Sequence, residues 1–474
     1  MRRRRLGGTG RRPPRGRRRV TAPASAGLLS LEAAREAVLA AVAGPLPEEP
    51  VALDAALGRV LAASIVAAVT LPPWDNSAMD GYAVRAADLG DAREDAPVRL
   101  DVIGDVPAGA SPGTQGPPGT ALRIATGAPL PRGADAVVPV EQTTPLDHEG
   151  RPGERGRDAS GPLPAAVLIH VGLRSGANVR TRGGDLVEGE TVVNAGVGVT
   201  PAVIALAAGA GLANLTVRRR PRVAVLATGN EVRPAGADIG EAGIPDANGP
   251  GLRALVRAAG GEPLDLGIAT DELGSVLPRL RSALASGADA IVVSGGVSVG
   301  PYDVVKLAFE SIGEVGLWRV AVQPGKPFAF GVADRAGGVA NTGDGGSKVL
   351  LFGLPGNPVS TFVTFELFVR PALRAMAGRA AVLRPVDRGV LLDDAHSSPG
   401  RRTFLRVMAD RDADGAPTHD EQGRARVRLA RGPAGQGSHV LSALAAADAL
   451  AVVREAVEQH RAGEPVELWW LDTA

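Results

Sequence analysis

Arg222-Val-Ala-Val-Leu-Ala-Thr-Gly-Asn-Glu231 is an apolar run of the length of one buried strand, followed at once by a polar turn. Further apolar runs of strand length follow it and alternate with segments of helical spacing. Strands that alternate with helices in this way predict a mostly parallel sheet covered on both faces. Ligands of such sheets bind beyond the carboxyl ends of the strands. The expected strands are 222–228, 263–268, 288–293, 317–322 and 349–353, and the expected helices are 250–259, 271–285, 302–311 and 358–377.

The regions before and after this α/β segment have other patterns. Ser30 is a candidate N-cap for a helix that runs toward Gly44, and a second helix is expected at 53–63. Short apolar runs broken by Gly and Pro over residues 71–162 predict a small β domain. Strands alternating with turns are expected over 186–218. The sequence thus predicts a multidomain α/β plus β chain. Its expected parts are a disordered Arg-rich tail (1–26), an elongated α+β domain (27–70 with 163–218), a small β domain (71–162), a mostly parallel α/β domain (219–380, with a flexible insert at 333–348) and a C-terminal β-barrel-like domain (381–474).

Composition excludes several classes of function. The 474 residues exceed what one core supports, and 22% charged with 45% hydrophobic residues is a normal globular balance. The absence of cysteine excludes disulfides, thiolate nucleophiles and Cys-based metal centres. Only 3% of residues are aromatic, which disfavours a base-stacking nucleic-acid surface. No uncharged apolar run reaches the length of a membrane span.

Charge is distributed unevenly along the chain. Residues 1–20 carry ten Arg and no acidic residue, so the net charge of +1 conceals an acidic remainder. Such a tail could anchor nucleic acid or acidic lipid. The charges are accompanied by almost no apolar residues, so we favour a solvated, disordered extension without catalytic purpose.

Two glycine-containing loops follow strands of the predicted sheet. Ser294-Gly-Gly-Val-Ser-Val-Gly300 lets backbone amides approach an anion, and the hydroxyls of Ser294 and Ser298 can add donors. Gly353-Leu-Pro-Gly-Asn-Pro358 specifies one rigid backbone path into a helix. Either could be a plain turn by itself. Two preorganised loops at adjacent strand ends instead predict a cleft.

Charged side chains are expected at the same edge of the sheet. Glu231 ends the first strand's turn, and Asp246, Asp271 and Asp303 follow strands or begin helices. Each Asp could be an ordinary N-cap, but together they could hold Mg²⁺ through water and phosphate oxygens. Lys326, fixed between Gly and Pro, is either a surface lysine or a rigidly presented cation for an oxyanion.

Polar motifs also occur outside the α/β segment. Pro73-Trp-Asp-Asn-Ser-Ala-Met-Asp-Gly-Tyr-Ala-Val84 is dense in polar residues with Met79 and Tyr82 as anchors. Thr126-Gly-Ala-Pro129 and Arg180-Thr-Arg-Gly-Gly-Asp185 are further polar turns. A simpler interpretation of the last turn is a surface ion pair between its arginines and Asp185.

Taken together, these motifs resemble the molybdopterin molybdenumtransferase family, which includes the catalytic domain of gephyrin-type proteins. The similarity runs from about residue 27 to the end, and the tail lies outside it. Eight short motifs occur in the family's order: PWDNSAMDGYAV (73–84), RIATGAP (123–129), NVRTRGGD (178–185), TGNE (228–231), SGGVSVG (294–300), QPGKPFAFG (323–331), GLPGNPVS (353–360) and GQGSH (435–439).

The resemblance implies a reaction and a set of site residues. Adenylylated molybdopterin would bind, molybdate would be placed at its dithiolene sulfurs, and hydrolysis of the adenylate would release AMP. Carried over by motif, Asp75, Thr126, Asp185 and Glu231 are the implied catalytic residues, and Asp185 and Glu231 would also hold Mg²⁺. The implied cleft for the pterin phosphate comprises Thr228, Asp271, Ser294, Gly295, Gly296, Ser298, Asp303, Pro355, Gly356, Asn357 and Pro358. The implied molybdate contacts are Lys326, Arg406 and Ser438.

One position departs from the family pattern. Gln323 stands where some members carry a second lysine, so one cation is missing from the implied molybdate site, although an amide can still donate a hydrogen bond.

The resemblance also implies a cytoplasmic homodimer with its cleft between the α/β domain of one subunit and the small domain of the other. The expected partners are small-molecule substrates, a molybdopterin adenylyltransferase and the receiving molybdoenzymes, without membrane or nucleic acid. Two alternatives stay open. The adenylyltransferase itself has similar loops, but the β regions on either side of the α/β segment argue against it. A non-catalytic scaffold is disfavoured by the retained Asp75, Asp185 and Glu231.

Overall fold

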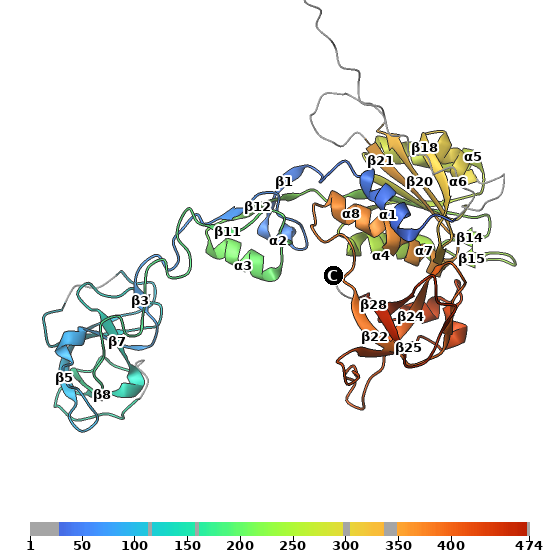
Figure 1. The fold of residues 1–474 in the computed structure, drawn as a ribbon. Helices are drawn as coiled ribbons and strands as arrows, with labels where there is room; N and C mark the ends of the chain where they lie inside the picture. Colours follow the sequence, from blue (N-terminus) through green and yellow to red (C-terminus); the bar gives the residue numbers. More distant parts are fainter. Residues whose placement is uncertain (1–27, 112–115, 157–160, 297–303, 336–347, 472–474) are drawn as a thin grey trace, which may run out of the picture. The chain divides into compact units, whose positions relative to one another are not determined.

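The computed structural model describes residues 28–111, 116–156, 161–296, 304–335 and 348–471 (Figure 1). Ser298, Asp303, the Arg-rich tail and most of the insert at 333–348 lie outside these residues. The chain divides into two compact units. The first comprises residues 1–49, 58–62 and 217–474, and the second comprises 50–57 and 63–216. The finer division into four domains stays a prediction.

A six-stranded sheet forms the centre of the first unit, in the order β16-β13-β17-β21-β20-β18. Its first four strands are parallel to one another, and β20 runs antiparallel to both of its neighbours, β21 and β18, which confirms a mostly parallel sheet. The predicted strand 317–322 was wrong in its bounds, because β18 ends at Arg319 and Val322 belongs to the separate β19. The strands are β13 (Arg222–Thr228), β16 (Glu262–Ala269), β17 (Ala290–Ser294), β18 (Gly313–Arg319), β20 (Pro327–Asp334) and β21 (Lys348–Leu354).

Helices cover both faces of this sheet (Figure 1). Val223 and Val225 of β13 are buried on one face, and Ala224 and Leu226 are buried on the other. Burial on both sides explains why the strand is continuously apolar. The first face packs against α1 (Leu31–Ala40), α4 (Asn248–Ala258), α7 (Pro358–Thr364) and α8 (Arg370–Met376), with a π-helical turn (Phe365–Val369) joining the last two. The second face packs against α5 (Leu273–Ala285) and α6 (Val304–Glu310).

The C-terminal segment closes into a five-stranded barrel. Strand β24 pairs with both β25 and β26, so the order β24-β25-β22-β28-β26 returns to β24 and leaves no free edge in that ring. The predicted β-barrel-like domain is therefore confirmed. Its strands are β22 (Asp387–Leu391), β24 (Arg402–Ala409), β25 (Ala425–Leu429), β26 (Ala449–Val453) and β28 (Pro465–Trp470). Smaller elements beside it are β19 (Val322–Gln323), β23 (Ala395–His396), β27 (Gln459–His460), a 3₁₀ turn (Pro433–Gln436) and α9 (Leu441–Ala445).

The second unit contains another six-stranded sheet, in the order β7-β4-β6-β5-β9-β8, which confirms a small β domain. These strands are β4 (Gly81–Val84), β5 (Val98–Val106), β6 (Thr120–Ile124), β7 (Ala136–Pro139), β8 (Thr143–Leu146) and β9 (Ala166–Ile169). Two expectations were wrong here. Residues 201–209 form the helix α3 (Pro201–Gly209), capped by the Thr200 hydroxyl, and the helix expected at 53–63 is only α2 (Leu53–Ala56).

Short elements complete the chain. They are β1 (Glu48–Ala52), β2 (Ile65–Val66), β3 (Asn76–Ser77), β10 (Val179–Arg180), β11 (Thr191–Val193), β12 (Asn214–Arg218), β14 (Val232–Arg233), β15 (Ile244–Pro245) and 3₁₀ turns at Ala86–Asp88 and Val140–Gln142. Among the described helices, none combines the length and apolar character that crossing a membrane requires.

A buried carboxylate organises the amino ends of β13 and β17. Asp289 is 2% exposed and accepts hydrogen bonds from the guanidinium groups of Arg219 and Arg335 at 2.9 Å and from the backbone amide of Arg222 at 2.8 Å. The side chains of Arg219 and Arg335 are about a third exposed, whereas the Asp289 carboxylate is almost fully buried. The buried charge of Asp289 is therefore stable only when all of these donors are present.

We expect Asp289→Ala to lower the free energy of unfolding by about 3 kcal/mol, because it leaves the partly buried guanidinium groups of Arg219 and Arg335 and the Arg222 amide without their acceptor. Chemical denaturation measures this change. Asp334→Ala is the matched control, since Asp334 pairs with Lys348 at the surface and its loss should cost below about 1 kcal/mol. Equal effects of the two substitutions would contradict the structural role assigned to Asp289.

Candidate functional site

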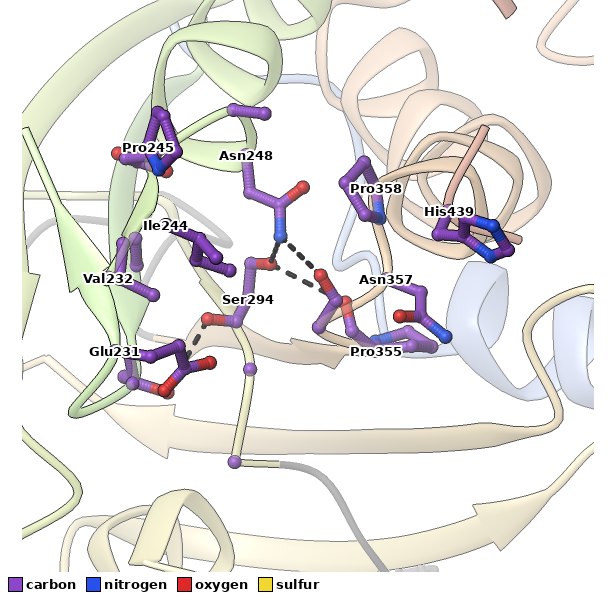
Figure 2. Close-up of a pocket in the computed structure, with 18 of the residues that line it drawn as sticks. Glu231, Val232, Ile244, Pro245, Asn248, Ser294, Pro355, Asn357, Pro358 and His439 are labelled. Carbon is purple, nitrogen blue, oxygen red and sulfur yellow. Dashed lines mark hydrogen bonds between the residues drawn. The ribbon is translucent and has the colours of Figure 1, made fainter. Parts of the chain in front are cut away.

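A cleft of about 880 Å³ opens at the carboxyl ends of β13, β17 and β21 (Figure 2). Three predicted loops converge there because these strands are parallel neighbours in the sheet. The structure thus brings most of the predicted pterin residues to one place, while their roles stay predictions. The predicted residues that line the cleft are Thr228, Glu231, Asp271, Ser294, Gly295, Gly296, Pro355, Gly356, Asn357 and Pro358, together with Asp246.

Asn248 connects two of these loops, and the sequence motifs did not identify it. Its Nδ2 group donates to Ser294 Oγ and to the Gly356 carbonyl oxygen, each at 2.7 Å. Figure 2 shows the amide between the two loops. Because Asn248 is the first residue of α4, the position of that helix fixes the width of the cleft at this point.

Ser294 holds the loops together. Its side chain is buried, its hydroxyl accepts from Asn248, and it lies 3.4 Å from the Pro355 carbonyl oxygen. Thr361 of α7 donates to the carbonyl oxygens of Pro355 at 2.5 Å and Asn357 at 3.1 Å. Donation from Ser294 to a phosphate stays a prediction, and in this structure its hydroxyl bonds within the protein.

Gly295 and Gly296 adopt backbone conformations that favour glycine, with φ values of +97° and +62°. A Cβ atom on Gly295 would lie 2.4 Å from the Thr228 carbonyl oxygen. The Gly295 amide donates a hydrogen bond to the Leu354 carbonyl oxygen at the end of β21. A glycine at this position therefore allows the ends of β13 and β21 to lie close to it. Both glycines line the cleft, and neither brings a side chain into it.

Three carboxylates line the cleft, and two of them have structural partners. Asp271 and Asn230 exchange hydrogen bonds of 3.2 Å, and Asp246 accepts from the Gly249 amide at 2.8 Å at the start of α4. No hydrogen bond or ion pair to a described residue engages the exposed Glu231 carboxylate. No cluster of three or more metal-binding side chains occurs among the residues with described positions.

Cations gather beside the cleft around Lys326. The positive charge of Arg319, then partial burial, then the charge of Arg401 lower the pKa of Lys326, so both arginines lie close enough to repel this lysine. Pro327, the next residue, lines the cleft. Ser438 is also near the cleft, because its hydroxyl accepts a hydrogen bond of 3.0 Å from Nδ2 of Asn357, which lines the cleft. A small dianion would relieve this repulsion.

The molybdate contact of Arg406 stays a prediction, and the structure shows this side chain bonded within the protein. Arg406 is 1% exposed, and its guanidinium donates to the carbonyl oxygens of Phe404, Gly435 and Gly437 at 3.1–3.2 Å. Burial lowers its pKa to about 10. Arg406 therefore shapes the turn before Ser438, and the cation nearby in the sequence whose charge acts on Lys326 is Arg401.

Gln323 also has a defined contact. Its Oε1 atom accepts from the Ser398 amide at 3.3 Å, which places the side chain against the loop that leads to Arg401. The NH₂ group is the part of this amide that can donate, as expected for a substitute of lysine.

The three motifs that carry the predicted catalytic residues of the second unit form their own cluster. The carboxylate of Asp75 accepts from the Arg182 amide at 2.7 Å, and Arg180 of β10 pairs with Asn76 of β3. Thr126 donates to Asp80 through its amide at 2.6 Å and its hydroxyl at 2.8 Å, and these bonds lower the pKa of Asp80. Three motifs thus meet around residues 75–80.

Asp80 also belongs to this cluster, although the motif predicted a role for Asp75 alone. The signal was present, since both acids belong to the same polar run. Asp185 is exposed, and in the described part of the chain no ion pair joins it to Arg180 or Arg182. The surface-ion-pair interpretation is therefore not supported, while the catalytic roles of Asp75, Thr126 and Asp185 stay predictions.

We expect Gly295→Ala to destabilise the fold by about 1–3 kcal/mol, because its Cβ collides with Thr228 in a backbone conformation unfavourable for alanine. Ligand affinity of the cleft should fall as well. Thermal unfolding and calorimetric titration measure both changes. Gly274→Ala in α5 is the control, since a Cβ there meets no atom within 4 Å. An unchanged midpoint for Gly295→Ala would disprove the close approach.

Comparison with protein families gives three consecutive matches. Residues 29–211 match the MoeA N-terminal region (domain I and II). Residues 224–375 match a probable molybdopterin binding domain, and residues 388–471 match the MoeA C-terminal region (domain IV). These matches together span the described chain almost from end to end.

Full-length relatives and solved structures are similar as well. Molybdopterin molybdenumtransferase 2 of Mycobacterium tuberculosis is 39% identical over 428 residues, covering 88% of this chain and 94% of the relative. Molybdopterin molybdenumtransferase of Haemophilus influenzae is 32% identical, covering 93% and 98%. The crystal structure of the molybdopterin biosynthesis moea protein from Pyrococcus horikosii superposes with a TM-score of 0.70 at 32% identity, covering 94% and 99%.

Proposed function

Because the chain belongs to the MoeA family of molybdopterin molybdenumtransferases, we propose that it inserts molybdate into adenylylated molybdopterin and releases AMP. One observation carries this proposal. Loops from three separate motifs, 228–231, 294–296 and 355–358, line a single cleft beside the cations around Lys326. The cleft offers a place for the pterin phosphate, and the cations offer a place for an oxyanion.

The cleft would hold the phosphates mainly through backbone. Gly296 and Gly356 line it without side chains, so an anion can approach their peptide groups closely. Asn248, Ser294 and Thr361 would act indirectly, because their hydrogen bonds keep these loops at a fixed separation. Preorganisation of this kind reduces the cost of ordering the site on binding.

Molybdate, as a substrate, would bind between Lys326, Arg401 and Arg319, with Ser438 as a hydroxyl donor. Binding a dianion removes the repulsion that lowers the pKa of Lys326, so it should keep that lysine protonated. Charge-assisted hydrogen bonds from lysine and arginine are the contacts that an oxyanion prefers. Gln323 would add an amide donor at the edge of this group.

Glu231 would hold Mg²⁺ together with phosphate oxygens and Asp185, since Mg²⁺ prefers oxygen ligands and needs few carboxylates when a phosphate is present. When bound, the ion would stabilise negative charge on the leaving adenylate. Glu231, Asp75 and Asp185 would position water and accept its proton. Attack of that water on the phosphorus breaks the bond between the two phosphates, leaving AMP and the molybdenum-loaded pterin phosphate.

Incubation of the purified chain with adenylylated molybdopterin, molybdate and Mg²⁺ tests this function. We expect AMP release that depends on molybdate, together with a product that activates a cofactor-free molybdoenzyme. Omission of molybdate is the control. Binding of the substrate without release of AMP would favour a non-catalytic scaffold, and formation of adenylylated molybdopterin from ATP would favour the adenylyltransferase alternative.

The predicted catalytic residues belong to two units, with Glu231 in the first and Asp75, Thr126 and Asp185 in the second. We therefore propose a homodimer in which the second unit of one subunit completes the cleft of the other. The same proposal includes a cytoplasmic location, where the chain would receive its substrate from an adenylyltransferase and pass the product to molybdoenzymes.

Mixed dimers test the shared site. Dimers that combine one Glu231→Gln subunit with one Asp185→Asn subunit should retain about half of the wild-type rate, because one of their two clefts has both native residues. Dual affinity tags allow these dimers to be purified, and AMP release gives the rate. Each homodimeric variant should be inactive. An inactive mixed dimer would place all catalytic residues of a site within one chain.

A further inference from the structure

The residues just before α1 pair with the segment that follows β18. The Leu29 amide donates to the Arg319 carbonyl oxygen, and the Ala321 amide donates to the Leu29 carbonyl oxygen, each at 2.8 Å. The chain then enters α1, where Glu32 stands in the first turn. This part of the chain therefore lies against the cations around Lys326, and nothing in the function described so far uses it.

Arg401 and Lys326 are tied to the same short segment through the backbone. The Arg402 amide donates to the Ala321 carbonyl oxygen at 2.9 Å, as part of the pairing of β24 with β19. The Val320 amide donates to the Lys326 carbonyl oxygen, also at 2.9 Å. The residue after Arg401 and the peptide of Lys326 are thus bonded to neighbouring residues of one segment, which brings the two cations together.

The side chain of Arg402 joins this loop to two further elements. Its guanidinium pairs with Glu32 of α1 and, at 2.9 Å, with Glu455 after β26. Glu455 holds the loop a second time, because its carbonyl oxygen accepts from the Gly400 amide at 3.1 Å. The Arg402 side chain is only 21% exposed. A planar guanidinium that is held by two carboxylates has a fixed orientation.

We propose that Arg402 is a positioning residue for molybdate, which holds Arg401 beside Lys326 through its ion pairs with Glu32 and Glu455. This inference rests on the proposed function, because it takes these cations as the molybdate site. Both carboxylates already engage the Arg402 guanidinium, so its effect on molybdate is indirect. The Arg401 side chain is partly exposed and forms no ion pair with a described residue, so it is free to contact the anion.

Repulsion between like charges is the physical reason for this support. In the absence of an anion, Arg401 and Lys326 gain free energy by moving apart. Anchoring the loop on both sides of Arg401 prevents this relaxation, so the cations are already in place when the anion arrives. Glu32 and Glu455 also carry negative charge. By Coulomb's law alone they would weaken the binding of a dianion, whereas their positioning role strengthens it.

The opposite signs of these two effects make a direct test possible. We expect the double substitution Glu32→Ala with Glu455→Ala to weaken the binding of molybdate to the full chain about ten-fold, a loss typical of the supporting partners of an ion site. Calorimetric titration with molybdate measures this change. Affinity for adenylylated molybdopterin should stay unchanged. In the AMP-release assay the KM for molybdate should rise, while kcat at saturating molybdate stays near the wild-type value.

Glu36→Ala is the matched control, because Glu36 is an exposed glutamate of the same helix that forms no ion pair with a described residue. It should not weaken molybdate binding. A double-mutant cycle shows whether Glu32 acts through Arg402. In an Arg402→Leu background, Glu32→Ala should cause no further loss of molybdate affinity. All variants should keep a thermal midpoint close to that of the wild type, since the Glu32 side chain is largely exposed.

Unchanged or tighter molybdate binding in the double variant would overturn the positioning role, as would an equal loss in Glu36→Ala. A fall in kcat without a rise in the KM for molybdate, or a wild-type chain with no measurable molybdate affinity, would overturn it too. The titrations are independent of catalysis. A chain that shows the expected affinities but releases no AMP in the molybdate assay would contradict the proposed function and leave the role of Arg402 standing.

Discussion

The parallel register of β13, β17 and β21 is the constraint on which the site depends. Parallel neighbours end at the same edge, so the loops after Thr228, Ser294 and Leu354 meet there although long stretches of chain separate them. Asn248 then fixes their spacing by donating to Ser294 and to Gly356. Both faces of the sheet are buried under helices, so the core holds the strand ends in place, and strand ends held in this way can support a preorganised cleft.

Many polar residues of the site position backbone, and fewer are available to a ligand. Ser294 and Arg406 are both buried and bond to other parts of the protein, although their motifs predicted ligand contacts. Asp80 similarly holds Thr126 in the second unit. The groups that remain for ligands are exposed or partly exposed, chiefly Glu231 and Lys326 with its neighbouring arginines. This separation between supporting and contacting residues is common in preorganised sites.

The sequence predicted the mostly parallel sheet, the small β domain and the C-terminal barrel, because continuous or alternating apolar runs report burial directly. It also predicted that the glycine-rich and proline-rich loops meet. It could not identify Asn248, whose bonds span 46 and 108 residues and leave no local pattern. Nor could the sequence show which of Arg401 and Arg406 is buried, since the burial of Arg406 follows from the pairing of β24 with β26 that closes the barrel. The helix α3 was missed because its run of apolar residues has no polar face.

Binding of adenylylated molybdopterin at the carboxyl edge of the first unit is the central claim, and hydrogen exchange of backbone amides tests it most directly. Amides whose exchange requires local opening become protected when a ligand orders them. Addition of the substrate should slow exchange at residues 228–231, 294–296 and 355–357, and should leave the barrel strands β22 and β25 unchanged. Protection confined to other parts of the chain, with these three loops exchanging as in the free protein, would contradict the assignment of the cleft.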